Sequence, residues 1–297
     1  MIKSPILNRT GRFLTAHGFL FALFVFVGGI IVWTLYDTLV PSTEYWDLYY
    51  PNLPPPLDGK TIAQLSDLHL EDLRIPPQRI RAILQAAQPD LLVLTGDVIS
   101  TGSDLDKVSA YLDNLPSRYG KYIVMGNNDY AHFSHTLFER YLTLLRGLGW
   151  SPLLNDAVYN PDLHLWIIGV DDPATAHDDV PKAYAKLNNT NVQGTFRLVL
   201  AHSTDCLDDV AQEGADLLLT GHTHGGQIRL PGLQPFLANT YLGSKGLYEG
   251  YHVVEGIPLY INRGLGESML PFRFNVRPEI TIFTLHRGDS PPRHHTG

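Results

Sequence analysis

The 297-residue sequence predicts an α/β fold preceded by one N-terminal transmembrane helix. Three observations predict this class. From residue 59 onward, short apolar runs alternate with amphipathic helical segments, which is typical of sheets joined by crossover helices. Polar residues follow the ends of successive apolar runs, as they do where loops converge at one edge of an open sheet. The stretch 13–36 contains no Asp, Glu, Lys or Arg, so it can lie in a bilayer.

Composition narrows the function classes. The chain has 30 acidic and 22 basic residues and a net charge of -8, so a basic surface for duplex nucleic acid is not indicated. Its 13 histidines in an acidic chain favour a metal site instead. The single cysteine, Cys206, excludes an internal disulfide, and we interpret it as a buried packing residue rather than a nucleophile.

The apolar stretch 13–36 is predicted to cross the membrane once as a helix. Trp33 and Tyr36 fit an interfacial aromatic belt, and basic residues precede the stretch whereas acidic residues follow it. This asymmetry predicts that residues 1–12 are cytoplasmic and that the following domain lies on the outer face of a bacterial-type inner or plasma membrane. A cleaved signal peptide is the alternative. We favour an uncleaved anchor, because the run is long and no small-x-small cleavage site follows it.

The segments on either side of the main domain are predicted to be irregular. Residues 37–58 are rich in proline and are predicted to form an extended stalk. The folded domain is then predicted over 59–288. The Pro- and His-rich residues 289–297 are predicted to be a disordered tail.

Within the domain, each element is predicted from its periodicity and length. Short apolar runs predict strands over 61–65, 91–94, 121–125, 163–170, 197–201, 217–220, 259–261 and 279–285. Amphipathic segments predict helices over 78–88, 104–115 and 138–145. We expect the last two strands to belong to a second sheet.

Residue types that bind metals follow the ends of these strands. They are Asp67, His69, Asp97, Asn127, His202, His222 and His224. Each one alone is better explained as a capping aspartate or a satisfied core histidine, but together they indicate a metal site. Oxygen and imidazole donors without a thiolate suit divalent manganese, iron or zinc. Because seven ligands exceed the needs of one tetrahedral ion, the set indicates two ions, which in phosphoryl transfer clamp the attacking and leaving oxygens.

The motifs that contain these residues resemble those of calcineurin-like metallophosphoesterases. They are Asp67-x-His69, Gly96-Asp97, Gly126-Asn127-x-Asp129, His202 and Gly221-His222-x-His224. Two later stretches, 259–266 and 271–280, resemble the membrane-associated YkuE/YaeI-like branch, which is similar to UDP-diacylglucosamine pyrophosphatases. The resemblance extends from about Pro54 to Leu285. It implies a four-layer αββα sandwich of two mixed sheets flanked by helices.

The resemblance also implies a role for individual residues. Asp67, His69 and His224 would hold a first ion, Asn127, His202 and His222 a second, and Asp97 would bridge both. Manganese would be the preferred ion, with iron or zinc as alternatives. Asp97 and Asn128 would act in catalysis, and Asn128 and Arg263 would bind substrate.

Asn128 departs from the usual pattern of this family. Most members have a histidine here, which contacts the phosphoryl group and is commonly assigned to protonate the leaving oxygen. An amide donates hydrogen bonds but supplies no proton. His132 and His135 follow in the sequence and could reach back, although a helix entry or a surface position explains them more simply.

The sequence therefore predicts an anchored, binuclear metal-dependent phosphoesterase acting on a phosphodiester or pyrophosphate bond in a lipid-linked substrate. UDP-diacylglucosamine is the leading candidate, but this nucleotide lipid is expected on the cytoplasmic side, whereas the charge asymmetry places the domain outside. The alternative is a catalytically weakened, metal-binding scaffold for a protein partner, because the usual histidine is absent. The expected partners are a phosphorylated substrate and the bilayer, without nucleic acid.

Overall fold

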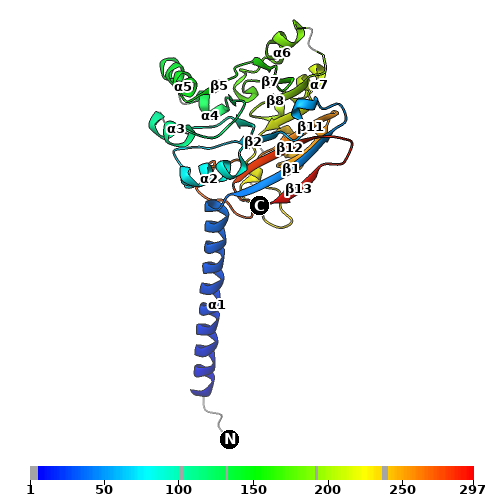
Figure 1. Cartoon of the computed structure of the whole chain (residues 1–297). Coiled ribbons are helices and arrows are strands. Elements are labelled where there is room, and N and C mark those ends of the chain that lie inside the picture. Colours follow the sequence, from blue (N-terminus) through cyan, green and yellow to red (C-terminus); the bar gives the residue numbers. More distant parts are fainter. Residues whose placement is uncertain (1–5, 101–103, 132, 191–192, 236–239) are drawn as a thin grey trace.

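The computed structural model describes residues 6–100, 104–131, 133–190, 193–235 and 240–297. Its domain contains two sheets between layers of helices, and one long helix projects from it (Figure 1). The first sheet has seven strands in the order β13-β1-β12-β2-β3-β4-β5. Their bounds are Arg293–Thr296, Ser42–Tyr50, Glu279–Arg287, Thr61–Leu65, Leu91–Thr95, Lys121–Val124 and Trp150–Pro152. Strands β2, β3, β4 and β5 are mutually parallel.

The second sheet has six strands in the order β10-β11-β9-β8-β7-β6. Their bounds are Gly250–Val254, Ile257–Ile261, Leu217–Thr220, Phe196–Leu200, Leu165–Gly169 and Asp156–Asn160. The α-helices α1 to α8 cover Ile6–Leu39, Pro77–Ala87, Leu105–Leu112, Asn127–Ala131, His135–Gly147, Val180–Asn188, Leu207–Glu213 and Tyr241–Ser244. Strands β7, β8, β9 and β11 are parallel, whereas β6 and β10 are antiparallel to their neighbours, so this sheet is mixed. The first sheet is also mixed, because β12 is antiparallel to β2 and β13 is antiparallel to β1.

Three apolar clusters define the layers. One lies between the two sheets, where Ile62 and Val93 of the first sheet share a cluster with Leu198 and Leu219 of the second. A second packs the other face of the first sheet against α2, α3 and α5, and a third packs the other face of the second sheet against α6 and α7. Buried strands with apolar side chains on both faces are expected in such a sandwich. The arrangement confirms the predicted four-layer αββα fold.

Helix α1 stands apart from these layers (Figure 1). Its segment Gly18–Leu39 has 22 residues and a hydropathy of 2.4, and it contains an 18-residue apolar window of which no residue is buried. Within this segment, only Asp37 and Thr38, near the end of the helix, are buried against the domain. A core helix of this composition would be covered by other elements. The segment is therefore long and apolar enough to cross a membrane.

The structure corrects both predictions of irregular segments. Residues 42–50 of the predicted stalk form β1, which pairs in parallel with β12 over its whole length. Residues 293–296 of the predicted tail form β13, which pairs with β1. The prolines of the stalk region lie outside these nine strand residues, where their missing N–H groups do not interrupt the sheet. Strand β12 belongs to the first sheet, so only β11 of the last two predicted strands lies in the second.

Candidate metal centre

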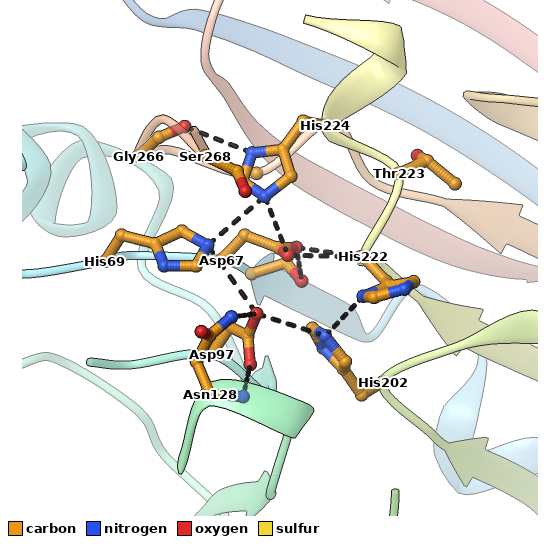
Figure 2. Close-up of polar contacts among 12 residues, drawn as sticks. Asp67, His69, Asp97, Asn128, His202, His222, Thr223, His224, Gly266 and Ser268 are labelled. Atoms are coloured by element: carbon orange, nitrogen blue, oxygen red, sulfur yellow. Dashed lines mark hydrogen bonds and ion pairs between the residues drawn. The ribbon is translucent and has the colours of Figure 1, made fainter. Parts of the chain in front are cut away.

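The predicted ligands gather where five strands end. Strands β2, β3 and β4 of the first sheet are followed by Asp67 and His69, Asp97, and Asn127, and strands β8 and β9 of the second by His202, His222 and His224. Parallel strands end at the same edge of a sheet, so the two sheets bring the aspartates and histidines of this set together (Figure 2). Five of these ligands have left-handed backbones: Asp67, His69, Asp97, His222 and His224. Such conformations in non-glycine residues cluster at functional sites.

The first group contains Asp67, His69 and His224. Each offers one ligand atom, and these atoms lie within 4.8 Å of one another. The Nε2 atoms of His69 and His224 are 3.2 Å apart, and Asp67 Oδ1 is 3.4 Å from His224 Nε2. All three residues are buried, which favours a bound cation over separately solvated side chains.

The second group contains Asp97, His202 and His222, with ligand atoms again within 4.8 Å. His222 Nδ1 is 3.0 Å from His202 Nε2, and Asp97 Oδ2 is 3.3 Å from the same Nε2. Asp97 Oδ2 is also 3.6 Å from His69 Nε2 of the first group. One carboxylate oxygen therefore lies within reach of both groups (Figure 2).

Hydrogen bonds orient the imidazole rings toward the centre. His202 Nδ1 donates to the carbonyl of Thr95 at 2.8 Å, and His224 Nδ1 donates to the carbonyl of Gly266 at 3.3 Å. Because a carbonyl only accepts, these bonds place the ring proton on Nδ1 and turn Nε2 inward. Such outer hydrogen bonds fix the tautomer of metal-binding histidines.

An unpaired acceptor tests whether the residues fit a cation. Asn127 Oδ1 is buried, and it has no hydrogen-bond partner among the described residues. A buried amide oxygen without a donor carries a desolvation cost of about 1–3 kcal/mol. A cation beside it would satisfy this oxygen, so the donor set of carboxylate, amide and imidazole groups fits divalent ions.

The electrostatics favour ligand forms that bind cations. Burial and the neighbouring His202 lower the pKa of His222 to about 3. Burial and His69 lower the pKa of His224 well below 6.5. Asp97 has a lowered pKa because His202 and His69 outweigh its burial. Two neutral imidazoles and an ionised carboxylate are the forms that a divalent cation requires.

Asp67 and His202 are the exceptions. Burial raises the pKa of the Asp67 carboxyl above 3.8. The burial of His202 opposes its protonation, but Asp97 and Asp67 outweigh that effect and raise the pKa of His202 well above 6.5. A cation bound there would take the place of this proton, so binding would release it.

Asp129 belongs to the motif Gly126-Asn127-x-Asp129, but the sequence did not predict that it binds the backbone of two loops. This buried aspartate accepts the backbone N–H groups of Asp97 and Gly126, both at 2.9 Å, and that of Val98 at 3.1 Å. It therefore holds the loop after β3 against the loop after β4. Burial, reinforced by repulsion from Asp97, raises the pKa of Asp129 to about 7. The position of Asp129, two residues after the predicted ligand Asn127, was the one feature of the sequence that could have indicated this role.

Asp67 is held from two sides. Ser66 Oγ donates to Asp67 Oδ2 at 2.6 Å, and the backbone N–H of His222 donates to the same oxygen at 3.0 Å. A Cβ atom at Gly221 would overlap both Ser66 Oγ and the Asp67 carboxylate. Glycine at this position therefore allows the turn before His222 to approach Asp67.

Asn128 lies between Asp97 and an open pocket. Its Nδ2 donates to Asp97 Oδ2 at 2.7 Å, and its backbone N–H donates to Asp97 Oδ1 at 2.9 Å. The pocket, of about 390 Å³, is lined by His69, Asp72, Ser100, Asn128, Glu267, Ser268, Met269, Leu270 and Pro271. Asn128 thus lines this pocket beside Asp97, and its role in binding substrate stays a prediction.

The structure corrects the prediction for Arg263. Its guanidinium forms ion pairs with Glu44 of β1 and Glu279 of β12, and its Nε is 3.6 Å from Glu249 Oε2. It does not line the pocket beside Asn128. Arg263 therefore links β1 to β12 and lies away from the pocket in which it was predicted to bind substrate.

Neither nearby histidine is seen to replace the usual acid. His135 begins α5, is exposed, and lines a separate hollow with Leu105 and Asp106 of the α3 region. His132 lies outside the described residues.

Comparisons with known proteins agree with this geometry. The family profile of calcineurin-like phosphoesterases matches residues 60–226. Two uncharacterized metallophosphoesterases of Bacillus subtilis are similar: YkoQ is 32% identical over 226 residues, or 74% of this chain and 82% of that protein, and YkuE is 31% identical over 242 residues, or 78% and 81%. The UDP-2,3-diacylglucosamine pyrophosphatase LpxG of Chlamydia muridarum is 26% identical over 331 residues, or 88% and 98%.

The profile covers every predicted ligand, from Asp67 to His224. The similarity to YkoQ and YkuE extends over most of the chain, as does that to LpxG. The chain therefore belongs to the calcineurin-like phosphoesterase family and is a hydrolase.

Proposed function

We propose that this chain is a binuclear metal-dependent phosphoesterase that hydrolyses a phosphodiester or pyrophosphate bond in a lipid substrate. The placement of Asp97 Oδ2 carries the binuclear proposal, because it lies 3.6 Å from His69 Nε2 and 3.3 Å from His202 Nε2. These nitrogens belong to different ligand groups. A single carboxylate shared by two groups suits two neighbouring cations.

The proposed chemistry divides between the ions and the chain. Two divalent cations, when bound, would neutralise phosphoryl charge and make water a stronger nucleophile at neutral pH. Asp97 would hold both cations, and Asp129 would hold the backbone of Asp97 in place. The amide of Asn128 has two N–H donors. Because Asp97 uses one of them, the other can bind a phosphoryl oxygen.

The lipid part of the proposal has two supports. The segment Gly18–Leu39 of α1 is apolar enough to cross a membrane and attaches directly to the domain. LpxG, which resembles the chain over most of its length, is named as a pyrophosphatase of a diacylated nucleotide sugar. A catalytically weakened scaffold is the second candidate, and Asn128 favours it because it replaces the family's usual proton donor.

Metal content and turnover test the proposal together. Full-length protein purified in detergent and loaded with manganese is expected to hold two ions per chain and to hydrolyse UDP-diacylglucosamine or an aryl phosphodiester. Asp97→Asn should lower the occupancy of both ions and reduce turnover by about 10²-fold or more. Asp162→Asn, in an exposed turn between β6 and β7, serves as the matched control.

Each candidate has a distinct outcome. Retention of two ions and near-native rates in Asp97→Asn would contradict the shared-carboxylate assignment. Two ions without turnover on any phosphomonoester, diester or pyrophosphate would favour the scaffold.

A further inference from the structure

The loop 268–278 is fastened to the end of α1. The backbone N–H of Arg273 donates to Thr38 Oγ1 at 2.9 Å, and that of Asn275 donates to Asp37 Oδ2 at 2.5 Å. Asp37, Thr38 and Arg273 are buried, whereas Asn275 is exposed. These hydrogen bonds therefore fix the position of the loop along the axis of α1.

The loop lies beside the last apolar turns of α1. The rings of Trp33 and Phe274 have centroids 5.9 Å apart, and the Arg277 guanidinium lies 5.1 Å from the centroid of the Tyr36 ring. Trp33 precedes the helix end at Leu39 by about 9 Å along the axis, given the rise of about 1.5 Å per residue. Tryptophan, tyrosine and arginine are typical of the membrane interface. Phe274 thus lies level with the interfacial end of the proposed span.

The loops that meet at Phe274 carry exposed apolar side chains. Outside α1, the large apolar side chains exposed among the described residues are Leu230, Leu233, Tyr241, Val253 and Met269. Three of them, Leu230, Leu233 and Met269, lie in two loops that meet at Phe274, where Arg229 N donates to Phe274 O at 3.0 Å. We name these three residues the apolar rim. Met269 is 80% exposed, which is costly in water and favourable in a lipid interface.

The apolar rim continues into the pocket of the metal centre. Met269 lines that pocket together with Leu270 and Pro271, and His69 and Asn128 line it as well. The buried guanidinium of Arg273 contacts the carbonyl of Gly266, which also accepts from His224 Nδ1. One loop therefore connects the end of the helix, the rim and the metal centre.

We infer that the apolar rim inserts into the leaflet next to the end of α1, so that the pocket opens at the membrane surface. This inference rests on the proposed membrane anchor and deepens the proposed function. A lipid substrate would then bring its phosphate to Asn128 while its acyl chains stay in the bilayer. A water-soluble ester would gain nothing from the rim.

Site-specific fluorescence tests the insertion without any activity. Leu230→Cys, Leu233→Cys and Met269→Cys are labelled with an environment-sensitive dye in full-length protein reconstituted into phosphatidylcholine/phosphatidylglycerol vesicles. Val253→Cys, on the exposed strand β10, is the matched control, and the native Cys206 is buried. Dyes at the rim should shift to the blue and be quenched at least twofold more than the control by lipids with a spin label near the headgroup.

Two results would overturn the inference. Quenching equal to that of Val253→Cys at all three positions would place the rim in water. A blue shift without lipid quenching would mean that a second protein copy covers it.

Kinetics provide an independent arm, with substrates that separate the rim from the metal centre. The double variant Leu230→Ser, Leu233→Ser should lower the rate of hydrolysis of UDP-diacylglucosamine in vesicles by about tenfold or more. Each substitution removes the favourable free energy of transferring a leucine side chain from water to lipid. The rate of this variant on soluble bis(p-nitrophenyl) phosphate should stay unchanged. Equal loss on both substrates would contradict membrane insertion, whereas lipid quenching without turnover by the wild type would retain the insertion and reject the proposed function.

Discussion

At the scale of single residues, Asn128 distinguishes this site from most of its family. Its amide donates to Asp97 and faces the pocket, but it cannot supply a proton to a leaving oxygen. Catalysis should therefore depend on how well the leaving group carries negative charge unaided. A phosphate or a phenolate leaves more readily on these terms than an alkoxide.

Asn128→His should therefore speed the hydrolysis of alkyl esters more than that of pyrophosphates or aryl esters. The gain should reach up to the roughly 10²–10⁴-fold that general acid catalysis supplies. The measurement is the slope of log rate against leaving-group pKa in both proteins, with Asn128→Gln as a control that keeps the amide. Equal slopes would show that another donor already protonates the leaving oxygen.

At the scale of elements, β1 is held in the sheet by charge as well as by backbone pairing. Glu44 of β1 binds Arg263, and Glu44 Oε2 is 2.8 Å from His294 Nε2 of β13. Burial opposes ionisation of Glu44, but Arg263, His294 and Ser42 outweigh it and lower its pKa from 4.5 to about 2. Since the folded pKa is depressed, the ionised form stabilises the fold above pH 4.5, and this contribution is lost as the pH falls toward 2.

Glu44→Gln should therefore lower the free energy of unfolding at pH 7 by on the order of 2 kcal/mol and flatten its pH dependence between 4.5 and 2. The measurement is chemical unfolding in detergent across this pH range. Glu139→Gln, on the exposed surface of α5, is the control. Parallel pH profiles for wild type and Glu44→Gln would show that Arg263 does not stabilise β1 through this carboxylate.

At the scale of the whole molecule, the orientation of α1 decides which substrate pool the pocket meets. Lys3, Arg9 and Arg12 precede the span, so the N-terminus should be cytoplasmic and the domain outside. A reporter that is active only outside the cytoplasm, fused after Gly297, should therefore be active, and a cytoplasm-only reporter at the same position should be silent. The opposite pattern would place the domain inside and make a cytoplasmic nucleotide lipid the first candidate.

Much of the candidate metal centre could be predicted from short sequence patterns. The seven predicted ligands could be found because each follows a short apolar run, and six of them form the two ligand groups. Asn127, the seventh, has the buried oxygen without a hydrogen-bond donor among the described residues. The buried strands β2, β3, β4, β7, β8, β9, β11 and β12 and the helices α2, α3 and α5 likewise follow from periodicity over a few residues, whereas the short strands β5, β6 and β10 and the helices α4, α6, α7 and α8 were not predicted.

Contacts between residues far apart in the sequence determined the features that were not predicted. Residues 42–50 became a strand because β12 pairs with them more than 200 positions away, as the bond from Ser42 to Pro278, 236 residues apart, illustrates. Arg263 lies outside the pocket beside Asn128, since it pairs with Glu44, 219 residues distant. The sequence by itself determined the candidate ligands, the apolar span and the order of the buried strands and of three helices, since these depend on neighbouring residues. Only the tertiary structure decided which strands pair, where the charges meet and how the pocket sits beside the helix, because these depend on contacts between segments far apart in the chain.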